Sequence, residues 1–210
     1  MRKKIISIIA LLSLIACLFT ACDWAELNSS VQDMKGSIKG CTYNCMFFDN
    51  NGGLFLTATG ENIDLESNIV REEVYTDGSW GYTKTLSSVV TITIDGHQME
   101  SCGSTVIFAE DSLSPEVDFT LEDIDSHSDG SLTSWTSVAG IVNQYKNSFG
   151  KPVVVVIQSQ LGDPICAYSG DDVYWEVCED LPKTTKLMID NKALYIHRAN
   201  FQIIDKELLN

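Results

Sequence analysis

From residue 40 to residue 110, apolar and polar positions alternate with a period of two, the pattern of β-strands that are buried on one face. The alternation is clearest in four runs, "CTYNCMFF", "LFLTATG", "SVVTITIDGHQME" and "STVIFAE". Asp95-Gly96 separates two β-rich runs and is a typical hairpin turn. Asn50–Gly53 and Asp77-Gly78 mark further turns. Short strands spaced about ten residues apart predict a sandwich or a barrel.

The C-terminal part of the chain returns to the β pattern after Pro152. Four consecutive valines in "VVVVIQ" (Val153–Gln158) predict a strand that is buried on both faces. The runs "PICAYSG", "DVYWEV", "TKLMID" and "ALYIHRANFQII" follow, and Asp190-Asn191 joins two of them as a hairpin. We interpret "SGDD" (Ser169–Asp172) as a turn whose carboxylates have no visible partner, and His197-Arg198 as a surface or edge pair.

Two segments have helical spacing instead. The first set recurs at intervals of three and four residues and comprises Trp24, Leu27, Val31, Met34 and Ile38. The second lies between Val138 and Phe149 and ends at Gly150. The predicted fold is therefore mainly β: a single barrel- or sandwich-like antiparallel domain with one inserted amphipathic helix and an N-terminal helix. An α+β fold is the alternative.

Residues 1–21 are typical of an export signal, with Arg-Lys-Lys followed by an uncharged apolar run from Ile5 to Ala21. The run is at the short end of what spans a bilayer as a permanent anchor. Ordinary signal cleavage requires small residues at the last and third-last positions, which neither Ala16 nor Ala21 provides. Two sites instead resemble the bacterial lipobox, in which a cysteine after a small residue receives lipid: "LIAC" ends at Cys17 and "FTAC" at Cys22.

We expect Cys22 to be the lipid attachment site. Cys17 has the better letter pattern but lies inside the apolar run, whereas the chain turns polar at Asp23 directly after Cys22. Two acyl chains would then hold the protein stably on a membrane. The expected organisation is a lipoprotein signal peptide at 1–21, a membrane-proximal helix or tether at 22–39, and a β-rich globular domain at 40–210. The expected location is the outer face of the bacterial cell membrane.

Charge excludes one class of function. The chain has 14 basic and 29 acidic residues, a net charge of −15, and three of the basic residues belong to the leader. Such a surface repels nucleic-acid phosphates, so we predict no nucleic-acid partner. The segment 111–137 is rich in Ser, Asp and Glu and predicts a long acidic loop. Asp125, Asp129 and Gly130 in this loop imitate a calcium-binding loop, but Thr136 replaces its final Glu.

No recognisable catalytic, cofactor or metal site emerges from the residues. The five cysteines outside the leader and lipid site are an odd number with no close Cys-x-x-Cys pair, so their disulfide state stays open: Cys41, Cys45, Cys102, Cys166 and Cys178. A nucleophilic Cys102 or Cys166 paired with His197 is conceivable, but no motif marks it. We expect small core thiols instead, and we predict no cofactor, no metal and no catalytic residue.

The functional prediction is a membrane-anchored extracellular lipoprotein with a non-enzymatic domain that binds a ligand or a partner, either protein or carbohydrate. Aromatic residues beside turns, such as Trp80, Trp135 and Trp175, could form an exposed platform for such a ligand. A cell-envelope hydrolase or transferase with an unrecognised site is the alternative, and a structural subunit that assembles through the N-terminal helix is a third reading.

A resemblance to a known family supports the expected location at the cell membrane. The leader with "CDW", together with "TITIDG", "TVIFAED" and the run "VVVVIQSQLGDPICAYSGDDVYWEV…LPKTTKLMIDNKALYIHRANFQIID", resembles a family of uncharacterised lipoproteins from Gram-positive gut bacteria. The family is a domain of unknown function, and the resemblance covers nearly all of the chain after the leader. It implies surface anchoring through Cys22 and assigns no catalytic or binding residue.

Overall fold

The computed structural model describes residues 34–76, 78–119, 147 and 149–209. These residues belong to two compact units, one with the hairpin Ile69–Ser87 and one with Met34–Asn68 and Ser88–Asn210. Described strand pairs are all antiparallel. Within the described residues, no helix is long and apolar enough to cross a membrane.

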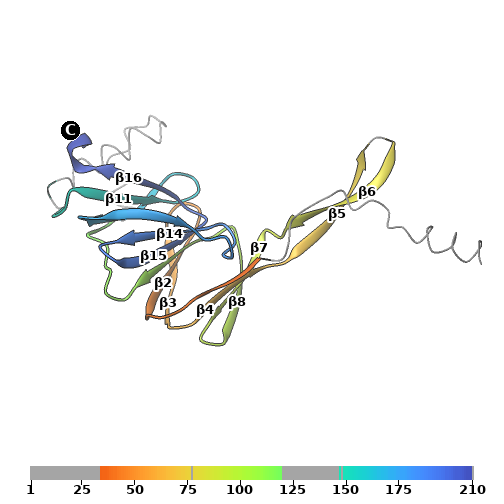
Figure 1. Cartoon of the computed structure of the whole chain (residues 1–210), viewed down its shortest axis with the longest axis horizontal. Coiled ribbons are helices and arrows are strands. Elements are labelled where there is room, and N and C mark those ends of the chain that lie inside the picture. Colours follow the sequence, from red (N-terminus) through yellow and green to blue (C-terminus); the bar gives the residue numbers. More distant parts are fainter. Residues whose placement is uncertain (1–33, 77, 120–146, 148, 210) are drawn as a thin grey trace, which may run out of the picture. The chain divides into compact units, whose positions relative to one another are not determined.

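The larger unit contains three sheets, and several of their strands are labelled in Figure 1. The N-terminal sheet has the order β1 (Met34–Ile38), β4 (Ile63–Ser67), β7 (Val89–Ile94), β8 (His97–Cys102). The central sheet has the order β13 (Val173–Val177), β14 (Thr184–Ile189), β15 (Lys192–His197), β9 (Thr105–Glu110), β2 (Tyr43–Phe48), β3 (Leu54–Gly60). The C-terminal sheet has the order β10 (Val117–Asp118), β12 (Pro164–Gly170), β11 (Val153–Gln158), β16 (Asn200–Asp205).

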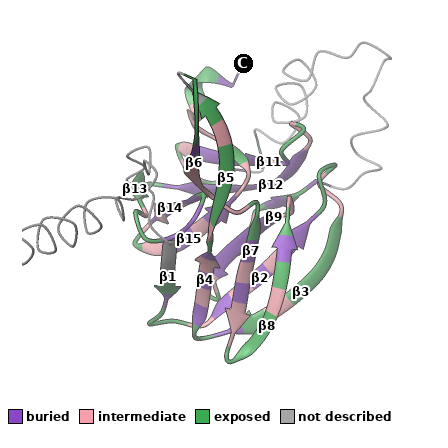
Figure 2. Cartoon of the chain, turned by 90° about the vertical axis from the view of Figure 1, so that its right-hand side faces the viewer, coloured by how far each residue is buried: buried purple, intermediate pink, exposed green. Residues whose placement is uncertain are grey.

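The central sheet is covered on both faces, and β9 is buried along most of its length (Figure 2). Val106 and Phe108 pack into a cluster with Ile63 and Ile92 of the N-terminal sheet. Ile107, on the opposite face of β9, belongs to a cluster with residues of the C-terminal sheet, including Val155, Ile157 and Tyr168. A strand with two buried faces needs apolar residues at consecutive positions, which explains the unbroken run in "TVIFA".

A third apolar cluster covers the outer face of the C-terminal sheet. Val154 and Val156 of β11 point to this face and contact Phe149 and Phe119 from the flanking segments. Val155 and Ile157 point the other way, toward the central sheet. The valine run is therefore buried on both sides, and the prediction made from "VVVVIQ" is confirmed.

The smaller unit is a two-stranded hairpin of β5 (Ile69–Thr76) and β6 (Ser79–Leu86). Its register places Tyr75 opposite Trp80 and Glu73 opposite Tyr82. The rings of Tyr75 and Trp80 lie 5.3 Å apart at an interplanar angle of 59°. Both side chains are exposed, so the two rings shield one another at the end of the hairpin.

β1 begins the described chain and forms the edge of the N-terminal sheet, paired with β4 over five residues. Gly36 in β1 lies so close to the loop before β14 that an added Cβ would come within 2.6 Å of the Asp180 carbonyl oxygen. Any larger residue would push β1 away from this loop. The close approach therefore ties β1 to the central sheet as well as to β4.

The mainly antiparallel β prediction is confirmed, and the hairpin turns at Asp95-Gly96 and Asp190-Asn191 have the expected left-handed backbone. No closed barrel forms among the described strands, because each sheet ends in an edge strand. The predicted N-terminal helix is wrong for Met34–Ile38, which is strand β1. Its first part and the predicted helix between 138 and 149 lie outside the described residues, apart from two positions.

Tyr168 provides a test of the core between the central and C-terminal sheets. Its phenol oxygen is buried with no hydrogen-bond partner among the described oxygens and nitrogens. Its polar neighbour is the thiol of Cys166, a weak hydrogen-bonding group. We predict that Tyr168→Phe leaves the free energy of unfolding unchanged or raises it by about 1 kcal/mol, because no strong hydrogen bond is lost. Tyr168→Ala should lower it by about 3–5 kcal/mol.

Urea unfolding of both variants beside the wild type measures this. A loss above about 1.5 kcal/mol for Tyr168→Phe would mean that the hydroxyl makes a net stabilising hydrogen bond.

Candidate functional site

Two adjoining cavities lie where β16 begins. The larger, about 510 Å³, is lined by Gln158, Gln160, Leu161, Gly162, Ala199, Asn200, Phe201 and Gln202. The smaller, about 340 Å³, is lined by Gln160, Lys183, Arg198, Ala199 and Asn200. They share three residues and so form one continuous groove, which we call the amide groove. Neither lining includes an Asp or a Glu, although the chain has 29 of them.

The strand register brings the amide side chains together. Gln158 at the end of β11 pairs with Asn200 at the start of β16, so both lie on one face. Gln202 is two residues further along β16 and shares that face. Gln160 comes from the loop after β11, and its amide group donates to the carbonyl of Gly103. Amide side chains from residues 158–160 and from residues 200–202 therefore line the same groove, and we call them the amide row.

Several of these amides have unused hydrogen-bonding capacity. Gln202 Nε2 donates to Gln158 Oε1 at 3.4 Å, and Asn200 Nδ2 donates to the Ser159 carbonyl at 3.0 Å. Among the described residues, no donor reaches the carboxamide oxygens of Gln160, Asn200 or Gln202. The groove thus presents a set of acceptor oxygens to whatever enters it, with the exposed side chain of Leu161 at its rim.

Two cations close the other end of the amide groove. Lys183 and Arg198 flank the pair Thr184↔His197 that ends the β14–β15 ladder, and the Arg198 amide donates to the Lys183 carbonyl at 3.1 Å. Both residues have a left-handed backbone, with φ of 51° and 52°. Such a conformation costs a residue with a Cβ about 1–3 kcal/mol. Like charges on facing positions are unfavourable as well.

The effect of one cation on the other appears in the pKa of Lys183. Burial and the neighbouring Arg198 charge lower the pKa of the Lys183 amine. Arg198 Nη2 donates to the Ser88 carbonyl, which holds the guanidinium in one orientation. Its Nε is buried and has no hydrogen-bond partner among the described residues. A buried donor on a cation without a partner is costly, and it adds to the backbone strain at this position.

His197, interpreted from the sequence as part of a surface pair, is buried instead. Its Nδ1 lies 2.9 Å from the Pro182 carbonyl oxygen and 3.1 Å from the Thr184 hydroxyl. A carbonyl can only accept, so we assign the Nδ1 proton to the bond with Pro182. Burial, together with the charges of Arg198 and Lys183, lowers the pKa of His197 to about 4, although the hydrogen bond to Pro182 acts in the opposite direction. The ring is therefore neutral at pH 7 and supports the strand end beneath the two cations.

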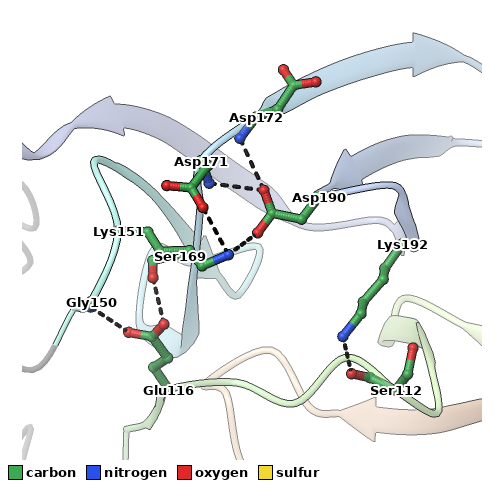
Figure 3. A network of polar contacts seen from close by, with 9 residues as sticks. All are labelled: Ser112, Glu116, Gly150, Lys151, Ser169, Asp171, Asp172, Asp190 and Lys192. Carbon is green, nitrogen blue, oxygen red and sulfur yellow. Dashed lines mark hydrogen bonds and ion pairs between the residues drawn. The ribbon is translucent and has the colours of Figure 1, made fainter.

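The turn "SGDD" has partners that the sequence did not reveal (Figure 3). Asp190 accepts from the backbone amides of Asp171 and Asp172 at 2.9 and 3.0 Å. Lys151 pairs with the carboxylates of both Asp190 and Asp171, the latter at 3.1 Å. The hydrogen bond from Lys151, followed by those from the two backbone amides, lowers the pKa of Asp190. These contacts join the β12–β13 connection and the β14–β15 turn to the segment just before β11, and we interpret the cluster as a structural clamp.

A further cavity, of about 390 Å³, contains the groups closest to a catalytic set, with Cys178, Lys186 and Tyr195 in its lining. Lys186 is paired with Glu176 at 2.7 Å. Burial raises the pKa of the Cys178 thiol and that of the Tyr195 phenol. A protonated thiol is a poor nucleophile, and no histidine lines this cavity. The cavity therefore contains no Cys–His pair of the kind that activates a thiol nucleophile.

The remaining sequence candidates are placed as follows. All five cysteines discussed above are free thiols; Cys45 and Cys166 are buried, and burial raises the pKa of Cys45 to about 12. Trp80 and Trp175 are exposed, on the hairpin and on β13. Cys17, Cys22, Trp135 and most of the acidic segment 111–137 lie outside the described residues. Within the described part of the chain, no group of His, Cys, Asp and Glu is arranged to hold a metal ion.

Sequence reasoning missed the amide groove. One signal was available, because polar amides alternate in "QSQ" after the valine run and in "NFQ" at the start of the last strand. A spacing of two predicts that the amides of each run share one face of a strand, which holds for Asn200 and Gln202, whereas Gln160 lies in the loop after β11. The sequence did not show that these two runs would pair, nor that Lys183 would lie across from Arg198.

Over residues 3–209 the chain matches a family described as a domain of unknown function, DUF5052. The chain belongs to this family. No curated protein and no solved structure matches it. The expected membership in a family of unknown function is therefore confirmed, whereas the lipid anchor and the Gram-positive source that the resemblance implied stay predictions. The groove must accordingly be interpreted from its own chemistry.

His197 should make stability depend on pH below neutrality. Its pKa is about 4 in the folded chain against an ordinary 6.5, so the unfolded chain takes up the proton first as the pH falls. Stability from this group is complete above pH 6.5 and decreases toward pH 4. Between pH 7 and pH 4.5 we predict a loss of roughly 2–3 kcal/mol.

Urea unfolding at both pH values, with wild type and His197→Asn, measures this loss. The Asn amide can still donate to Pro182 but does not titrate in this range, so the variant should lose less stability by that amount. Equal losses in the two proteins would show that other groups cause the whole pH dependence.

Proposed function

We propose that the protein is an exported lipoprotein, anchored at Cys22 to the outer face of the bacterial cell membrane, whose β-rich part binds a saccharide in the amide groove. The leader at 1–21 and the polar chain after Cys22 support export and lipid anchoring. The groove supports the binding role. Saccharides present many hydroxyl donors on a neutral ring, and they are abundant at the cell surfaces where an anchored protein works.

The observation that carries the binding role is the row of acceptor oxygens on Gln160, Asn200 and Gln202, which no described donor reaches. Ligand pockets combine an adequate volume with a small number of polar groups in fixed positions. The groove offers about 510 Å³ beside the amides. The hydrogen bonds from Asn200 to Ser159 and from Gln202 to Gln158 fix the side chains before a ligand arrives, which reduces the entropic cost of binding.

A binding role also agrees better with the buried groups than an enzyme role does. Burial raises the pKa of the Cys45, Cys166 and Cys178 thiols, so they stay protonated at neutral pH. His197 is buried and bonded to Pro182, and it lines neither cavity of the groove. We therefore keep the envelope-enzyme alternative as the outcome that would replace this proposal.

The amide groove can be tested with an array of neutral and acidic oligosaccharides, using the full chain purified in detergent. We predict binding to at least one oligosaccharide, with the affinity reduced about 3–10-fold by Gln202→Leu, because one hydrogen bond is lost. Gln98→Leu on β8, an exposed amide that lines neither cavity, is the matched control and should leave the affinity unchanged. No binding to any saccharide, or equal effects of the two variants, would contradict the proposal.

The anchor has a separate test in a bacterial host that grows with labelled palmitate. We predict that Cys22→Ala abolishes the label and moves the protein from the membrane fraction to the soluble fraction, because no acyl chains hold it there. Cys17→Ala should retain both the label and the membrane location. The reverse result would assign the anchor to Cys17 and leave the groove unaffected.

A further inference from the structure

We propose that the saccharide bound by the amide groove is acidic, and that Lys183 and Arg198 bind its carboxylate or phosphate group. This inference rests on the proposed function, because it names the ligand class of the same groove. Its starting point is a local reversal of charge. The chain carries −15 overall, yet the smaller cavity is lined by two cations, two amides and an alanine, with no acidic residue.

The positions of these cations are unfavourable for the fold. Lys183 and Arg198 are joined by a backbone hydrogen bond, each has a left-handed backbone, and the charge of Arg198 lowers the pKa of Lys183. Glycine or asparagine would adopt this backbone with less strain and without the repulsion. No side-chain hydrogen bond or ion pair from Lys183 is found among the described residues, so the fold does not explain why a cation stands there. An anionic ligand between the two charges would explain it.

The guanidinium is already oriented for such a ligand. Arg198 is partly buried and its Nη2 is held by the Ser88 carbonyl. A guanidinium that is already held in one orientation loses less side-chain entropy on binding a carboxylate or phosphate than a mobile one does. Lys183 is exposed and supplies a mobile second charge. Arg198 thus provides a positive charge with a fixed orientation, and Lys183 provides a mobile positive charge beside it.

The anion site between the two cations is continuous with the rest of the groove, which favours an acidic saccharide over a simple anion. Gln160, Ala199 and Asn200 line both cavities, so a group bound between the cations lies next to the acceptor oxygens of the amide row. One ligand that carries both an anionic group and several hydroxyl groups can fill both cavities. A free anion would leave the amide row without a role, and a neutral sugar would leave the two cations without one.

The net charge of the protein sets the range of this recognition. At physiological salt the Debye length is about 8 Å, so an anion in the groove interacts mainly with Lys183 and Arg198. A highly charged polymer extends beyond this distance and meets the acidic remainder of the surface. The groove should therefore prefer a short saccharide, or a saccharide with widely spaced charges, over a dense polyanion such as a nucleic acid.

The test uses the full chain in detergent and two matched probe pairs, measured by calorimetry. Trigalacturonic acid is compared with its methyl ester for the carboxylate, and glucose 6-phosphate with glucose for the phosphate. We expect the charged member of at least one pair to bind at least 10-fold more tightly than its neutral partner. Which pair responds tells whether the anionic group is a carboxylate or a phosphate.

Lys183→Asn should remove most of this preference, because it weakens binding of the charged member far more than binding of the neutral one. Because asparagine tolerates the left-handed backbone, the variant should also unfold at the same or a higher urea concentration, which separates loss of binding from loss of folding. Lys39→Gln removes one positive charge from an exposed position outside the groove. This control should keep the full preference.

Each failure has its own meaning. If neutral saccharides bind through the amide row and the charged members show no advantage, the acidic ligand is wrong and the proposed function stands. If no saccharide binds, both are wrong. Tighter binding of an acidic tripeptide, triglutamate, than of any saccharide would replace the saccharide by a peptide ligand at the same cations. A preference that survives in Lys183→Asn would overturn the role of Lys183.

Discussion

The burial of the central sheet on both faces is the constraint on which the larger unit depends. β9 contributes Val106 and Phe108 to one core and Ile107 to the other, so the N-terminal and C-terminal sheets pack against opposite sides of the same strand. Among the described residues, no apolar cluster joins the N-terminal sheet directly to the C-terminal sheet. A polar substitution at any buried position of β9 would therefore disturb one of the two cores directly, whereas a substitution in β3 or β8, at sheet edges, would disturb much less.

Strand positions were predictable where the period was unambiguous, and the errors have a physical reason. In β2 the alternation of Tyr43, Cys45 and Phe47 admits no helical reading, and all three are buried. Met34 and Ile38 are four residues apart, a spacing that suits one face of a helix and one face of a strand equally well. Gly36, which lies between them, has no side chain whose polarity would distinguish a helix from a strand. The close approach of Gly36 to Asp180, which the sequence cannot display, favours the strand.

The groove shows what pairing adds to a sequence. The amides of "QSQ" and "NFQ" are unremarkable apart, and they become a site because Gln158 aligns with Asn200. Likewise Lys183 and Arg198 are isolated cations until the β14–β15 ladder places them next to one another. His197 was assigned to the surface because its alternation was visible while its partner, the Pro182 carbonyl, belongs to another segment. The local sequence pattern indicates which residues lie on the same face of a strand. It does not indicate which residues of other segments lie opposite that face.

The position of β1 has a mechanical consequence. β1 is the first strand of the described chain, so a pull applied at its N-terminal end would first load the five-residue ladder between β1 and β4. Ile38 of β1 packs in the same apolar cluster as Leu181 of the loop before β14, so part of the same load would pass to the central sheet. β1 would thus resist shear through its ladder with β4 and through this packing contact.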